Sequence, residues 1–104
     1  MEVNRVAFLV KAADDLKEAL RSAAGLGVED RTVAVFLMDL DLTPYAGDEA
    51  FRELLELLGD LQIEVFTNRR PDFASEPIRY ASLEEMGALI GQHDLAICFG
   101  GSGR

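Results

Sequence analysis

The chain has a single cysteine, Cys98, and a single histidine, His93. One cysteine excludes an intramolecular disulfide and favours a reducing compartment. One histidine and one distant cysteine cannot form the usual zinc cluster, so we predict neither a metal nor a cofactor. No apolar run approaches the roughly 20 residues that span a bilayer, and the first residues lack the cleavage-site pattern of a signal peptide. These absences predict a cytoplasmic protein without a membrane partner.

Basic residues are also scarce, because 10 Lys and Arg face 19 Asp and Glu, for a net charge of −9. A negative field repels phosphate backbones and anionic lipids, so we expect no nucleic-acid partner. With 49% hydrophobic and 28% charged residues, the composition is that of an ordinary globular protein. The length of 104 residues corresponds to one domain, 1–104, large enough to bury a core without disulfides or metals.

Residues 33–38 form an uninterrupted apolar run, which is typical of a strand buried on both faces of a parallel sheet. Strand-like runs and helical spacing alternate along the rest of the chain. The expected strands are 3–10, 33–38, 63–66 and 95–99, to which 78–80 can add a short edge strand. The expected helices are 13–24, 48–58 and 82–90. This alternation predicts a three-layer α/β fold, in which helices cover both faces of a mostly parallel sheet of four to five strands.

Short-range signals predict where these helices begin and end. Asp14 and Asp15 are expected to cap the first helix, and Gly25 and Gly27 are expected to end it. The segment Ser82–Glu85 matches a capping box and predicts the start of the third helix.

Polar side chains follow the apolar strands. Ligands of parallel sheets bind outside the carboxyl ends of the strands, so we expect a binding pocket at that edge. Its predicted ligand-binding residues are Lys11, Asp39, Asp41, Thr43, Thr67 and Asn68. Arg69 and Arg70 can hold an anionic ligand there or pair with surface carboxylates, and the two aspartates can equally be solvated loop residues.

The sequence leaves open whether the chain is an enzyme. The candidate catalytic residues are Asp39, Asp41 and Cys98. Two carboxylates this close can bind Mg²⁺ while one of them attacks a phosphoryl group. Cys98 lies in an apolar run without a basic neighbour in sequence, so we expect a buried, unreactive thiol. Residues 100–104 are expected to be a tail, because no helix follows them to complete an anion-binding loop.

The spacing Asp39-x-Asp41-x-Thr43 resembles the first motif of the haloacid dehalogenase-like phosphatases. A strand that ends at Thr67 resembles their second motif. The resemblance implies a Mg²⁺-dependent phosphatase with an aspartate nucleophile and a phosphate held by Thr67. The chain departs from the pattern, because no acidic motif follows residues 95–99 and a complete strand and helix precede the first motif. A phosphatase is therefore the alternative function.

The order of elements over nearly the whole chain resembles the DsrE/DsrF-like family, also called the YchN-like fold. The likeness rests on an alanine-rich first helix, a strand ending at Asp39, a helix that opens Ser82-Leu-Glu-Glu, and a final strand at 95–99. It implies self-association as a trimer or hexamer, with a small-molecule or sulfur-carrier partner. In the sulfur-relay members a cysteine follows the third strand, where this chain has Thr67 and Asn68. We therefore predict an oligomeric binding or accessory module related to sulfur-relay proteins.

Overall fold

The computed structural model describes residues 4–29, 31–45, 47–69 and 78–99. Five strands form one sheet in the order β4-β3-β2-β1-β5, and every neighbouring pair is parallel. The strands are β1 (Arg5–Val10), β2 (Thr32–Leu37), β3 (Glu64–Thr67), β4 (Ile78–Tyr80) and β5 (Leu95–Phe99). The helices are α1 (Leu16–Val28), α2 (Glu49–Asp60) and α3 (Leu83–Ile90), with the short 3-10 turns η1 (Ala13–Asp15) and η2 (Thr43–Tyr45). The α/β fold class and the edge strand at 78–80 are confirmed.

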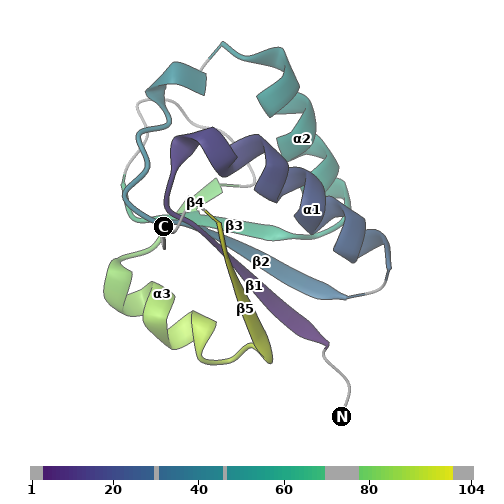
Figure 1. Cartoon of the computed structure of the whole chain (residues 1–104), viewed down its shortest axis with the longest axis vertical. Coiled ribbons are helices and arrows are strands. Elements are labelled where there is room, and N and C mark those ends of the chain that lie inside the picture. Colours follow the sequence, from purple (N-terminus) through teal and green to yellow (C-terminus); the bar gives the residue numbers. More distant parts are fainter. Residues whose placement is uncertain (1–3, 30, 46, 70–77, 100–104) are drawn as a thin grey trace.

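The three helices cover the two faces of the sheet unequally. Figure 1 shows α1 and α2 on one face and α3 on the other. The chain steps in one direction from β1 to β2 and β3, so right-handed crossovers place α1 and α2 on the same face. The connection from β4 to β5 runs back across the sheet, and the same handedness therefore puts α3 on the opposite face.

Alternating side chains of the strands supply a core on each face of the sheet. The larger core lies under α1 and α2 and includes Phe8, Val35 and Leu37. The smaller core, under α3, is built around Phe36, Phe66 and other residues that alternate with the first set. The last five residues of β2 are buried, because this strand contributes to both cores. The prediction of a strand buried on both faces is confirmed.

β5 is an edge strand whose side chains are more exposed than its apolar sequence suggests. Among the described residues it pairs only with β1. Leu95, Ala96 and Cys98 are exposed, and Ile97 and Phe99 are half-buried against the larger core. An apolar run alone does not distinguish a central strand from an edge strand, because strand order depends on the connections.

The start of α1 differs from the prediction. The chain first forms η1, and neither its N-cap residue nor Asp15, the N-cap of α1, makes a side-chain capping hydrogen bond. Asp14 and Asp15 lie in the 3-10 turn, where their negative charges face the positive end of the helix dipole. The expected side-chain cap is therefore wrong.

The predicted end of α1 is also wrong, because the helix continues through both glycines to Val28. Gly27 lies against Ile63, and a Cβ atom at this position would be 2.7 Å from Ile63 Cδ1. A Cβ at Gly25 would have no atom within 4 Å. Gly27 thus allows a close approach between α1 and the segment before β3, and it does not end the helix.

The other two helices begin where the sequence predicts, and the capping box of the third is confirmed. The Asp48 carboxylate accepts a hydrogen bond from the Phe51 backbone N–H at the start of α2. Ser82 and Glu85 form a complete capping box at the start of α3. In the described part of the chain, no helix is long and apolar enough to cross a membrane.

The end of α2 places a residue other than glycine in the left-handed region. Gln62 has φ 61°, its N–H donates to the Gly59 carbonyl, and the Ile63 N–H donates to the Leu58 carbonyl. These two bonds make a Schellman motif, in which the left-handed position is usually glycine. Glutamine adopts this conformation at an energetic cost that glycine would not incur.

The two glycines of α1 give a matched test of the packing. Gly25→Ala is expected to raise the free energy of unfolding by about 0.5–1 kcal/mol, because alanine favours the helix and meets no atom. Gly27→Ala has the same helix preference but must displace the buried Ile63 side chain, so we expect it to be less stable than Gly25→Ala by about 1 kcal/mol. Urea unfolding measures both values. Equal stabilisation by the two variants would contradict the close approach at Gly27.

Candidate functional site

Asp39 and Asn68 meet at the carboxyl ends of β2 and β3. The Asn68 side-chain amide donates to Asp39 Oδ1 at 2.8 Å, and the Asp39 backbone N–H donates to Asn68 Oδ1 at 2.7 Å. Asp39 has φ 59°, in the left-handed region that Asp tolerates better than most residues. The two hydrogen bonds hold this conformation and join the loops that follow the two strands.

Asp41 is held within its own turn. Its carboxylate accepts a hydrogen bond from the Thr43 backbone N–H at 3.0 Å. This bond, a side-chain hydrogen bond with Thr43 and the positive charge of Arg69 together hold the pKa of Asp41 below its ordinary value of 3.8. At neutral pH the side chain is therefore an exposed anion, which can accept hydrogen bonds but cannot act as a general acid.

Thr67 is fully buried, and its hydroxyl serves the backbone of the next loop. The hydroxyl donates to the Arg69 carbonyl at 3.1 Å and accepts from the Arg69 N–H at 3.2 Å. Both the donor and an acceptor position of the hydroxyl are thus engaged within the chain. Thr67 therefore closes the loop that follows β3.

The six predicted binding residues form separate local contacts. Asp39 contacts Asn68, and Asp41 contacts Thr43. Lys11 is exposed at the end of β1, where its backbone N–H donates to the Phe99 carbonyl at 3.0 Å. Neither of the two cavities described below is lined by any of the six. Arg70 and residues 100–104 lie outside the described residues.

Asp39 and Asp41 are the pair that the phosphatase resemblance assigns to Mg²⁺. Across residues 4–29, 31–45, 47–69 and 78–99, no group of three or more His, Cys, Asp or Glu side chains is placed to hold a metal ion. One oxygen of each aspartate already accepts a hydrogen bond from within the chain. The described side chains therefore do not fit the metal site of that family.

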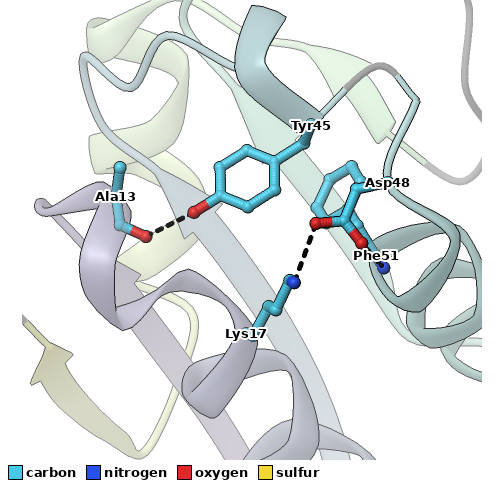
Figure 2. A network of polar contacts seen from close by, with 5 residues as sticks. All are labelled: Ala13, Lys17, Tyr45, Asp48 and Phe51. Atoms are coloured by element: carbon cyan, nitrogen blue, oxygen red, sulfur yellow. Dashed lines mark hydrogen bonds and ion pairs between the residues drawn. The ribbon is translucent and has the colours of Figure 1, made fainter.

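A second polar network joins four segments at the same edge and was not predicted from the sequence. The Tyr45 hydroxyl donates to the Ala13 carbonyl at 2.8 Å, and Lys17 Nζ forms an ion pair with Asp48 at 2.8 Å (Figure 2). The Lys17 ammonium lies 5.9 Å from the centre of the Tyr45 ring, which packs on Phe51 at 5.0 Å between ring centres. The network holds η2 against α1 and α2.

Cys98 is exposed, which corrects the expectation of a buried thiol. The residue is paired with Leu9 in the register of β1 and β5, on the face of the sheet that carries α3. α3 does not cover β5, so an apolar strand position that would be buried at the centre of the sheet is open at its edge. Access, which reactivity of a thiol requires, is present at Cys98.

The larger of the two cavities lies at the amino-terminal ends of the strands, whereas the pocket was predicted at their carboxyl ends. It has a volume of about 430 Å³ and lies beside the amino-terminal halves of the strands and the end of α3. Its polar lining residues, which no sequence motif pointed to, are Arg5, Thr32, Gln62, Glu64, Arg79 and His93. A second hollow of about 350 Å³ lies between α3 and β4 and includes Tyr80, Ala88 and Leu89. Phe66 and Leu89 line both cavities.

No family model, curated protein or solved structure matches this chain. The DsrE/DsrF-like and phosphatase-like resemblances therefore rest on the motifs and element order described above. The function has to be inferred from the arrangement of the chain's own residues.

The Lys17–Asp48 ion pair predicts a pH dependence of stability. Lys17 and the Phe51 N–H lower the pKa of Asp48 below its ordinary value of 3.8, so protons bind more strongly to the unfolded chain. The stabilisation by Asp48 is therefore complete above that pH and is lost as the pH falls through the lowered pKa. Asp48→Asn keeps a capping oxygen and removes the charge. We expect it to be less stable than the wild type at pH 7, with the difference shrinking below about pH 4.

Urea unfolding of both proteins at neutral and acidic pH measures this difference. Glu53→Gln, at an exposed position of the same helix, is the control for loss of one negative charge. A pH dependence for Glu53→Gln equal to that for Asp48→Asn would contradict a specific role of the ion pair.

Proposed function

We propose that this chain is a cytoplasmic binding or accessory module of the DsrE-like kind that acts as a homo-oligomer. The observation that carries the proposal is β5, an uncharged edge strand with exposed apolar side chains. The chain's single cysteine supports a cytoplasmic location, since a sequence that can form no internal disulfide suits a reducing compartment. β3 ends at Thr67 and is followed by Asn68, neither of which can carry a persulfide, so a persulfide relay at that place is not part of the proposal.

The two edges of the sheet differ in how they discourage pairing with another chain. β4 has three residues, and one of them, Arg79, is charged and paired with Glu64 at 3.5 Å. Short length and a charge are common devices that protect an edge strand. β5 has five residues without a charge, and its outer backbone groups have no strand partner in the described part of the chain. This edge is therefore open to strand addition.

A second copy of this chain is the occupant that suits β5. A net charge of −9 opposes self-association, and an uncharged strand is where that repulsion is weakest. The strand itself, Leu95–Phe99, carries no charge, so antiparallel pairing with a second β5 would bring no like charges opposite each other. Such pairing is two-fold symmetric and gives even-numbered assemblies, including the hexamer that the resemblance implies.

The polar edge of the sheet supports a module without a catalytic centre. Asp39 is bonded to Asn68, Asp41 to Thr43, and the Thr67 hydroxyl to the Arg69 backbone. These groups stabilise loops, and the described carboxylates do not gather around a metal position. Among the residues that the structure describes, no contact favours the phosphatase alternative, which is not proposed further.

Leu95→Lys tests the self-association. Leu95 is 45% exposed on β5, and Leu57, which is 43% exposed on α2, offers a matched control for the same substitution. We expect the wild type to have an even multiple of the 11.4 kDa chain mass, Leu57→Lys to keep it, and Leu95→Lys to halve it. Native mass spectrometry measures these masses. A monomeric wild type would contradict the proposal, and a trimer would contradict pairing through β5.

Cys98 reports whether β5 is covered. We expect a thiol reagent to label the Leu95→Lys variant, in which β5 is unpaired, at nearly the rate of the unfolded chain, because Cys98 is exposed in the isolated chain. Labelling of the assembled wild type is expected to be several-fold slower, since a second strand along β5 restricts access. Equal labelling rates in the two proteins would show that the interface lies elsewhere.

A further inference from the structure

The face of the sheet under α3 is only partly covered. α3 has eight residues and is therefore about 12 Å long, while five strands span about 19 Å in width. A helix about 10 Å in diameter covers roughly two of those strands. α3 buries Met86 against Phe36 and Phe66, and the strand positions nearer the amino-terminal edge lie beyond its last turn. The 430 Å³ cavity occupies this uncovered region.

The cavity has an apolar floor and a polar rim. Ala34, Phe66 and Leu89 contribute to the floor, and Phe66 stacks on Phe36 with 5.3 Å between ring centres and 15° between ring planes. The small side chain of Ala34 leaves space over the middle strand. A volume of this size lies in the range of small-molecule pockets, which combine an apolar lining with a few polar groups.

The charged groups of the rim lie toward its two sides. On β1, Arg5 uses one of its five N–H donors for the Gln92 carbonyl at 3.3 Å. On β4, Arg79 is paired with Glu64 at 3.5 Å and so is partly neutralised. Arg5 also has a carboxylate neighbour, because hydrogen bonds from the Arg5 and Asn4 N–H groups and the positive charge of Arg5 lower the pKa of Asp94. The Arg5 guanidinium has N–H donors beyond the one that bonds Gln92, and it can offer these to an anion. His93 lies at the end of α3, where its Nδ1 bonds the Leu89 carbonyl at 2.8 Å. A carbonyl only accepts, so Nδ1 is the donor, and in the neutral ring Nε2 is an acceptor.

Gln62 supplies a second, independent observation. It is strained at φ 61°, in a position where glycine is usual, and it lines the cavity. A glycine would relieve the strain but would remove the side-chain amide from the rim. Strained residues that persist in a fold are concentrated at functional sites.

We propose that this cavity, lined by Arg5, Thr32, Gln62, Phe66 and His93, binds a small organic anion with a planar apolar part. The acidic group pairs with Arg5, the planar part lies over Ala34 and Phe66, and the Gln62 amide donates to a polar edge of the ligand. This site is at the opposite end of the strands from the loops of Asp39 and Asn68, and it is independent of pairing through β5.

The probe for this site is anilinonaphthalene sulfonate, a planar aromatic sulfonate whose fluorescence rises in apolar sites. Titration of the native wild type should show saturable binding of one probe per chain. Arg5→Gln is expected to weaken binding about tenfold through loss of a charge-assisted hydrogen bond. Arg21→Gln, an exposed position on α1, is the charge-matched control and should bind as the wild type does. Thr32→Phe, which fills the cavity from an exposed strand position, should abolish binding.

Gln62→Gly separates binding from folding. Relief of the left-handed strain should raise Tm by about 4–8 °C, while loss of the Gln62 amide should lower the affinity for the probe several-fold. Greater stability with weaker binding cannot result from partial unfolding. Unchanged affinity in Gln62→Gly or equal affinities of Arg5→Gln and Arg21→Gln would overturn the proposal. An absence of probe binding to the wild type would also overturn the proposal. The same holds if Ala88→Leu, which fills the hollow beside β4, abolishes binding while Thr32→Phe has no effect, because the probe would then bind in that hollow.

Discussion

A parallel sheet must be covered on both faces, and this chain has three helices with which to do so. Two long helices pack on one face and bury the core that contains Phe8, Val35 and Leu37. The other face receives only α3, whose eight residues protect the middle of the sheet around Phe36 and Phe66. The exposed strand β5 and the cavity at the amino-terminal edge both follow from this unequal covering. The surfaces that we propose for association and for ligand binding are therefore consequences of one constraint on the fold.

The polar groups at the carboxyl ends of the strands have a different role. Loops that follow buried strands carry backbone N–H and C=O groups that need partners. Asn68 bonds the N–H of Asp39, and Thr67 bonds both polar backbone groups of Arg69. Tyr45 reaches the Ala13 carbonyl across the neighbouring loops. Residue types that are common in catalytic sites here hold the loops in place through hydrogen bonds within the chain.

Local signals predicted much of the fold. The apolar run of β2 and the capping box at Ser82 each act within a few residues, and the structure contains both. Two predictions that depend on distant contacts were wrong. Gly27 lies within α1 against Ile63 and does not end the helix, and Cys98 is exposed because β5 lies at an edge. The rim residues Arg5, Gln62 and Arg79 come from three separate segments, and only the strand order brings them to one cavity. No spacing in the sequence carries that information.

Amide hydrogen exchange at two protein concentrations tests the central claim most directly. The claim is that the helices leave β5 open and that a second copy covers it. In concentrated solution, the β5 amides that point away from β1 should exchange slowly, and dilution below the dissociation constant should speed them by orders of magnitude. The amides of β2 should exchange equally slowly in both samples, because they lie at the centre of the sheet. Exchange of the outward β5 amides that is fast at both concentrations would contradict the account.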